Sequence, residues 1–166
     1  MKIREIQVAE ADAFSSLRKR VDAESQFMLF EAGERKVDAV EEKKKLESML
    51  KSETTTIFVA EQDGELVGYL VAVGSDAKKK RHAVYLVIGI LQDYQGIGVG
   101  TSLFNALEEW VNERNIHRLE LNVATRNEGG LALYKKFGFE VEGLKRQSML
   151  IDDEYVDEYY MAKLLS

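Results

Sequence analysis

The stretch "QGIGVG", residues 95–100, places glycine at every second position directly before a long helical pattern. Glycine has no side chain, so it lets a ligand come close to the main chain. The first N–H groups of a helix have no partner inside the helix and carry a partial positive charge, and phosphate is their usual ligand. The stretch favours a phosphate-binding turn, although a tight turn packed against a neighbouring element would also use glycine.

Two well-known phosphate loops do not fit this stretch. The Rossmann pattern G-x-G-x-x-G needs glycine at position 101, where the sequence has Thr101. The P-loop needs a Gly-Lys-Ser/Thr tripeptide, which the sequence lacks. What remains is the spaced pattern Gln95-x-x-Gly98-x-Gly100, between an apolar strand and a long helix.

This stretch and a second block together resemble the GNAT superfamily of N-acetyltransferases. The family signature [Q/R]-x-x-G-x-[G/A] matches residues 95–100. The family block N-x-x-A-x-x-L-Y-x-K-x-G-F matches "NEGGLALYKKFGF", residues 127–139, with Gly130 in place of the alanine. The C-terminal tail is similar to the bacterial branch that includes amino-acid and phosphinothricin-type acetyltransferases and ribosomal-protein N-terminal alanine acetyltransferases.

The resemblance implies that an acetyl group passes from acetyl-coenzyme A directly to an amine, without a covalent enzyme intermediate. Main-chain amides of residues 95–101 would hold the pyrophosphate. The pantetheine arm would lie beside the strand that ends at Ile88–Ile90, in a splay between strands 84–91 and 118–123. The residues expected to contact the cofactor are Ile88, Ile90, Gln95, Gly96, Ile97, Gly98, Val99, Gly100, Thr101, Asn127, Tyr134 and Lys136.

The resemblance also assigns two catalytic groups. A backbone N–H near Ile90 would stabilise the oxyanion, and Tyr134 matches the family tyrosine that gives a proton to the departing thiolate. By its spacing alone, Tyr134 is better explained as a core residue of an amphipathic helix. The attacking amine must be neutral, so a general base is needed; the candidates are Glu24, Glu31, His82 and a water chain.

The segment "SQFMLFEAG", residues 25–33, places four apolar residues in a predicted loop between the first two helices. The resemblance puts this loop at the acceptor site, so we expect Phe27, Phe30 and Glu31 to bind the substrate. If the apolar side chains of this loop border the site, an apolar amino acid or a peptide amino terminus would fit beside them. Alternatively, these side chains pack into the core. The acidic turn at 152–157 would instead attract a cationic acceptor. A protein N-terminal acetyltransferase and a non-catalytic coenzyme A-binding module are the competing hypotheses.

The elements that must position these residues follow from hydrophobic periodicity. Strands are predicted near 3–8, 54–62, 65–74, 82–91, 118–123, 139–149 and 154–164, and helices from Glu10, from about Glu34 to Leu50, from 99 to about 113 and from 127 to 137. The β-α-β piece at 82–123 should be a right-handed parallel crossover. We therefore expect one α/β domain, residues 1–166, with a GNAT-like, mostly antiparallel sheet of about seven strands and helices on both faces.

Composition narrows the function further. The chain has no cysteine, which excludes disulfides, thiolate metal sites and a cysteine nucleophile. Its two histidines lack metal-ligand spacing, so no metal is expected. The net charge of −6 argues against a nucleic-acid partner. No segment is apolar over the ~20 residues of a membrane span, and the start lacks a signal-peptide pattern. We expect a cytoplasmic protein without a membrane partner, and the sequence leaves a homodimer open.

Overall fold

The computed structural model describes residues 1–165, which form one seven-stranded sheet of order β1-β2-β3-β4-β5-β7-β6. The strands are β1 (Lys2–Glu5), β2 (Thr56–Gln62), β3 (Glu65–Val73), β4 (Ala83–Ile90), β5 (Arg118–Ala124), β6 (Glu140–Ile151) and β7 (Glu154–Leu164). The α-helices are α1 (Ala11–Glu24), α2 (Ala39–Lys51), α3 (Val99–Asn112) and α4 (Glu128–Lys136). None of the described helices is both long and apolar enough to cross a membrane.

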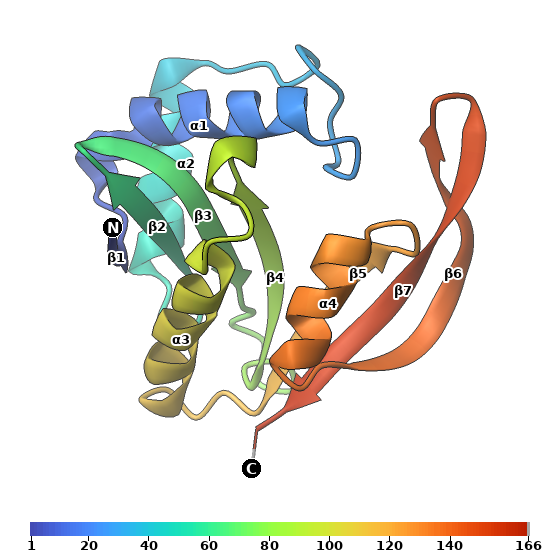
Figure 1. Ribbon diagram of the computed structural model, residues 1–166. Helices are drawn as coiled ribbons and strands as arrows, with labels where there is room; N and C mark the ends of the chain where they lie inside the picture. The colour runs from blue at the N-terminus through green and yellow to red at the C-terminus, as the bar shows by residue number, and fades with distance from the viewer. Residues whose placement is uncertain (166) are drawn as a thin grey trace.

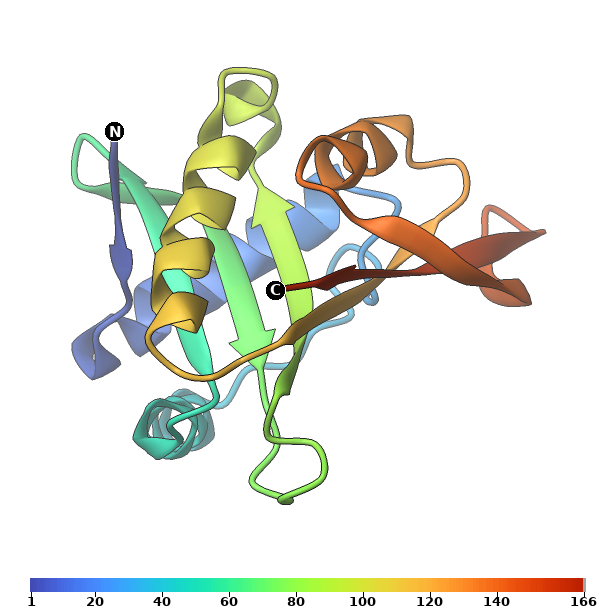
Figure 2. The same cartoon turned by 90° about the horizontal axis from the view of Figure 1, so that it is seen from below.

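The helices cover both faces of the sheet (Figures 1 and 2). Successive residues of a strand point to opposite faces, and β3 shows which helix lies on which side. A Cβ atom at Gly68 would stand 3.4 Å from Val99 of α3. The next residue, Tyr69, packs edge-on against Phe14 of α1, with 5.4 Å between ring centroids. Hence α1 and α3 lie on opposite faces, and both press against the same central strand.

The helical stripe predicted after the glycine-rich stretch is confirmed in α3. Its buried side chains recur at helical spacing, at Val99, Leu103, Phe104, Leu107, Trp110 and Val111. The second helix begins later than predicted, at Ala39 and not near Glu34. Asp38 explains the difference, because its side chain accepts the N–H groups of Val40 and Glu41 and so caps the helix there.

The pairing of β4 with β5 covers only a short part of each strand. These two strands are the sheet's one parallel pair, and they match only over Ala83–Tyr85 and Arg118–Glu120. Beyond Tyr85 the two strands diverge, while β5 continues to pair with β7 as far as Ala124. Figure 2 shows the two halves of the sheet, β1–β4 and β5-β7-β6, separating along this line. The splay expected from the family resemblance is therefore present.

Candidate active site

The turn that leads from β4 into α3 exposes bare main chain. A short 3-10 helix, η2 (Gln92–Tyr94), comes first, and Gly96 and Gly98 then take left-handed backbone angles, with φ of 74° and 93°. Residues other than glycine rarely adopt such angles. No atom lies within 4 Å of the place where a Cβ would stand at either glycine. A ligand can therefore touch the backbone directly here.

The same turn presents a group of free N–H donors. The first hydrogen bond inside α3 runs from the Ser102 N–H to the Gly98 carbonyl, at 3.0 Å. The N–H groups of Val99, Gly100 and Thr101 consequently have no partner within the helix. Together with the helix dipole, these donors form a site suited to a phosphate or pyrophosphate.

Gly100 serves a different purpose from the other two glycines. A Cβ at this position would stand 2.9 Å from Cδ2 of Leu133 in α4 and 3.5 Å from Cδ1 of Ile90. Glycine therefore lets α3 and α4 approach each other. The packing explanation left open by the sequence applies to Gly100, while the anion explanation fits Gly96 and Gly98.

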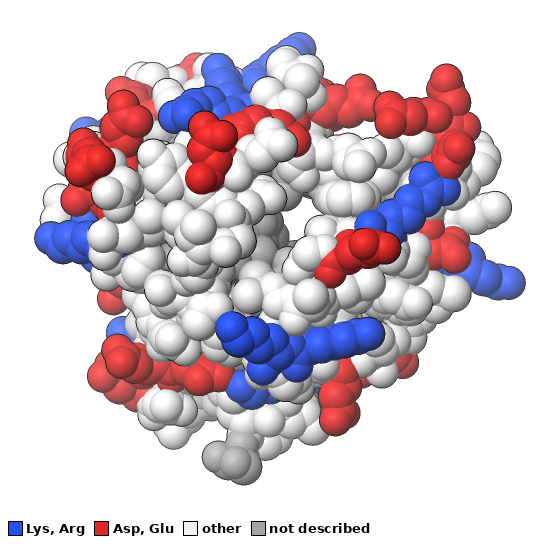
Figure 3. All heavy atoms as spheres, viewed as in Figure 1, with Lys and Arg blue, Asp and Glu red and all other residues white. Residues whose placement is uncertain are grey.

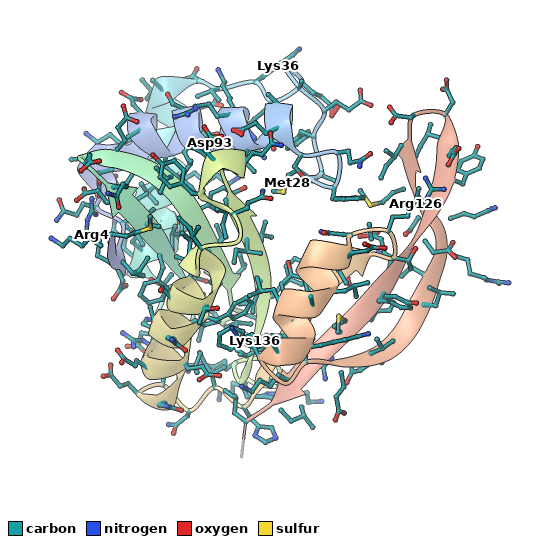
Figure 4. The ribbon with its side chains drawn as sticks, viewed as in Figure 1. Arg4, Met28, Lys36, Asp93, Arg126 and Lys136 are labelled. Atoms are coloured by element: carbon teal, nitrogen blue, oxygen red, sulfur yellow. The ribbon has the colours of Figure 1, made fainter. Side chains whose placement is uncertain are left out.

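Helix α4 packs against this region through its middle and its end. The Asn127 side chain accepts the Gly130 N–H at 2.9 Å and so caps the helix. A Cβ at Gly130 would lie only 2.7 Å from Nδ2 of Asn127, so the capping side chain explains why glycine replaces the family's alanine. At the other end, Lys136 Nζ lies 3.5 Å from Oγ1 of Thr101, and Figure 4 labels this lysine. It brings a positive charge to the first turn of α3.

The backbone of β4 has a free edge along the splay. The Leu91 N–H donates to the Val67 carbonyl of β3, whereas the carbonyl of His82 accepts from N–H groups at the start of β5. Because hydrogen-bonding groups alternate along a strand, the even-numbered residues of β4 face β5. The main-chain groups of Ile88 and Ile90 thus point into the splay, where β5 no longer pairs with them.

One of these groups already has a partner. The Gln95 side chain donates from Nε2 to the Ile90 carbonyl at 3.0 Å, which holds the glycine turn against the end of β4. The Ile90 N–H remains a donor directed at the splay. Glu24, at the end of α1, accepts the N–H of Gln92 at 3.1 Å, so a carboxylate lies close to the same strand end.

Tyr134 has a buried ring and an unpaired hydroxyl. The side chain is only 8% exposed and packs against Phe104 and Phe139, with ring centroids 6.0 and 6.1 Å away. Burial raises the pKa of its phenol, and the nearby Tyr85 adds to the effect. Within residues 1–165 the hydroxyl makes no side-chain hydrogen bond, and no fully enclosed side-chain polar atom lacks a partner. The protonated hydroxyl is therefore partly accessible. Figure 3 shows a hollow on this face of the molecule, between the end of β4 and α4.

The segment 25–38 crosses the other side of the splay. Phe27 packs in a small cluster with Ala124 of β5 and with Ile151 and Val156 of the β6–β7 hairpin. Met28 packs against the main core, and Figure 4 shows it between the end of β4 and the side of the molecule that carries Arg126. The segment thus connects the two halves of the sheet, with Phe27 as its anchor on the hairpin side.

A buried ion pair holds the same segment to α1. Arg35 Nε donates to Oδ2 of Asp22 at 2.7 Å, and the Asp22 side chain is 1% exposed. The Arg35 guanidinium also lies over the ring of Phe30, 4.7 Å from its centroid. Glu31 is exposed. No sequence pattern predicts the pairing of Arg35 with Asp22, because the two residues belong to no motif and meet only in the fold.

The candidate bases lie at opposite ends of β4. His82 precedes the strand, eight residues from Ile90, which corresponds to about 26 Å at ~3.3 Å per residue. It lines a cavity of about 860 Å³ together with Trp110 and Arg114, far from the glycine turn. The hypothesis that His82 is the base is therefore wrong, whereas Glu24 and Glu31 lie on the side of the segment that crosses the splay.

Comparisons with known proteins agree with this geometry. The sequence profile of the acetyltransferase (GNAT) family matches residues 20–139. The chain is 34% identical over 108 residues to an L-amino acid N-acetyltransferase of Escherichia coli, covering 64% of this chain and 67% of that protein. It is 36% identical over 119 residues to an N-alpha-acetyltransferase of Sulfurisphaera tokodaii, covering 64% and 70%.

The fold also matches that of a solved structure of this family. The crystal structure of a GNAT-family acetyltransferase from Streptococcus pneumoniae superposes with a TM-score of 0.94 at 28% identity, over 99% of both chains. The family profile covers most of the described chain, including the glycine turn and Tyr134. The chain therefore belongs to the acetyltransferase (GNAT) family, and it is an acetyl-coenzyme A-dependent N-acetyltransferase.

Proposed function

We propose that the acceptor is the primary amine of a small molecule, with apolar amino acids as the favoured class. The observation that supports a small acceptor is the anchoring of Phe27 on the β6–β7 hairpin, because it holds the segment 25–38 across the splay on the side opposite α4. A protein amino terminus would need an open groove. The E. coli relative, whose name specifies L-amino acids, supports the same class.

The residues present fit acetyl-coenzyme A. The free N–H groups between Gly96 and Thr101 would hold the pyrophosphate, with Lys136 as a nearby positive charge. The main chain of Ile88 would pair with the amides of the pantetheine arm, as a neighbouring strand does. The spare Nδ2 of Asn127 offers another donor from the start of α4, since its Oδ1 is used by the helix cap.

When bound, acetyl-coenzyme A supplies a thioester whose acetyl group can pass to the acceptor amine. The Ile90 N–H faces the splay and would donate to the carbonyl oxygen as negative charge develops there. Tyr134 keeps its proton at neutral pH, because burial raises its pKa. It would give that proton to the sulfur as the carbon–sulfur bond breaks, while the new carbon–nitrogen bond forms. The ammonium proton leaves through a base on the acceptor side, where Glu24 and Glu31 lie.

Peptide amino termini are the second candidate acceptor class, and the N-alpha-acetyltransferase of S. tokodaii favours it. A cationic acceptor has less support. Asp152 and Asp153 adopt left-handed backbone angles, with φ of 49° and 63°, and form the turn of the β6–β7 hairpin. Asp157 accepts the Gln147 N–H at 2.7 Å. Asp152, Asp153 and Asp157 therefore belong to the turn and the hydrogen bonding of the hairpin.

Thiol release from acetyl-coenzyme A with a panel of amines tests the proposal. The panel contains phenylalanine, methionine, alanine, spermidine and a short peptide with a free amino terminus. We expect phenylalanine and methionine to have the highest kcat/KM, by a graded margin, because one methylene in an apolar pocket is worth only about 1–3 kcal/mol. A peptide far ahead would support the N-terminal acetyltransferase instead. Tight cofactor binding without any transfer would leave a coenzyme A-binding module.

A further inference from the structure

A second buried phenol, that of Tyr69, lies on the α1 side of the splay. Tyr69 of β3 pairs directly with Gly89 of β4, and its ring extends across that glycine. A Cβ at Gly89 would stand 2.6 Å from Cε1 of Tyr69 and 2.8 Å from its hydroxyl oxygen. The ring thus fills the space that any other residue at position 89 would need. Its hydroxyl end lies over β4, the strand that borders the splay.

The Tyr69 hydroxyl is available to a ligand. The residue is only 1% exposed, and Phe14 packs edge-on against its ring. A buried tyrosine usually gives its hydroxyl a hydrogen-bond partner in the protein. Within residues 1–165 the Tyr69 hydroxyl makes no such hydrogen bond. Every side-chain polar atom that is completely buried in this part of the chain has a hydrogen-bond partner, so the Tyr69 hydroxyl is not completely buried. The small accessible part of Tyr69 must therefore include the hydroxyl oxygen.

The position of this hydroxyl relates it to the reacting groups. The Tyr69 hydroxyl lies over Gly89, which stands between Ile88 and Ile90, and the main-chain groups of these two residues face the splay. Consecutive Cα atoms are about 3.8 Å apart, so Gly89 directly adjoins both groups. Tyr69 lies on the face covered by α1, whereas Tyr134 comes from α4 on the other face. The phenols of Tyr134 and Tyr69 therefore lie on opposite sides of the splay, and that of Tyr69 is on the side that segment 25–38 crosses.

Burial keeps this phenol neutral. Burial raises the pKa of Tyr69 to about 12, although the guanidinium groups of Arg18 and Arg35 act to lower it. Asp22, which pairs with Arg35, acts in the opposite direction. At neutral pH the hydroxyl can donate one hydrogen bond and accept another.

We propose that the Tyr69 hydroxyl contacts the acceptor and orients its amine toward the acetyl group. This inference rests on the proposed function and adds a specific acceptor-binding residue to it. Tyr69 takes no part in proton transfer, which belongs to Tyr134 and to the base. It fixes the direction of attack by a hydrogen bond to the acceptor's polar head, next to the Ile90 N–H.

The test is the Tyr69→Phe variant, with Tyr155→Phe as the matched control. Tyr155 is 67% exposed on β7, so loss of its hydroxyl should have no effect. We expect kcat/KM for the best acceptor to fall about 10- to 100-fold in Tyr69→Phe, as for a lost hydrogen bond to a charged group. The loss should be the same from about pH 7 to about pH 9, since the phenol does not titrate there. The control should keep full activity.

Two further readouts separate this role from a structural one. At neutral pH, the melting temperature and the acetyl-coenzyme A affinity of Tyr69→Phe should equal those of the wild type, because the hydroxyl makes no bond within the described protein. Unchanged acceptor kinetics, or a loss that merely follows a lower melting temperature, would overturn the assignment. If the wild type acetylates no amine, the proposed function fails and this inference with it. If both proteins acetylate equally well, only the role of Tyr69 fails.

Discussion

Replacing Tyr134 by phenylalanine removes one hydroxyl and leaves the packing of α4 intact. The ring contacts with Phe104 and Phe139 are retained, since a phenylalanine ring can occupy the same place. The lost hydroxyl makes no side-chain hydrogen bond within residues 1–165 and so supports no other described element. We therefore expect the melting temperature and the affinity for acetyl-coenzyme A to change little.

The expected effect on turnover is large by comparison. If Tyr134 is the sole general acid, its loss should lower kcat by about 10²- to 10⁴-fold. This factor corresponds to about 2.7–5.4 kcal/mol of activation free energy. Because burial raises the pKa of the phenol above its usual value, the acid form persists to at least about pH 10. Ionisation of Tyr134 should therefore cause no decline of wild-type kcat below that pH.

Thiol release at saturating acceptor measures kcat, and calorimetry measures the acetyl-coenzyme A affinity. Tyr155→Phe is the matched control, because this tyrosine is 67% exposed on β7 and should be replaceable without loss. A Tyr134→Phe enzyme with wild-type kcat would refute the reasoning. The tyrosine would then be a core residue, as its spacing alone also allows.

Two other predictions follow from the turn and from the buried phenols. Gly98→Val should weaken acetyl-coenzyme A binding at least about tenfold, because φ of 93° resists a branched side chain and the free N–H groups would shift. Gly100→Val should instead displace Leu133 and lower the free energy of unfolding by about 1–3 kcal/mol. Calorimetry measures the affinity for acetyl-coenzyme A, and urea unfolding measures the stability of each variant. Unchanged affinity in folded Gly98→Val would exclude the anion site. The pKa values of Tyr69 and Tyr134 are higher in the folded state than in the unfolded state, where they are about 10. The stability that this difference contributes is complete below about pH 10 and is lost as the pH rises toward the folded-state pKa values. Melting temperatures between about pH 9 and pH 11 should therefore fall less in Tyr69→Phe than in the wild type, and equal slopes would contradict this.

The sequence predicted the elements that its motifs and periodicity define. The glycine turn, the buried stripe of α3 and the splay near Ile88 and Ile90 follow from local spacing or from the family blocks. The start of α2 was misplaced by a few residues, because a single capping side chain, that of Asp38, decides where the helix begins. Such a cap competes with the hydrophobic pattern and has no period of its own.

These sequence patterns do not predict contacts between distant segments of the chain. The pairing of Arg35 with Asp22 depends on how the segment 25–38 folds back onto α1. The position of Tyr69 depends on the register that sets it opposite Gly89. The packing of Phe27 against the hairpin likewise depends on how the segment 25–38 lies across the fold, while its expected role at the acceptor site stays a prediction. Each contact joins residues whose spacing in the chain carries no signal.

The splay gives the protein an edge strand in the middle of its sheet. Unpaired main-chain groups on an edge strand can template the addition of a foreign strand, and proteins usually protect such edges with charges, bulges or covering elements. Here α3 and α4 cover one face, and the anchored segment 25–38 crosses the other. A β-strand of another molecule would have to displace these elements before it could pair with Ile88 and Ile90, whereas a single flexible chain such as a pantetheine arm would not. The elements that border the proposed cofactor site would thus also protect the sheet against self-association.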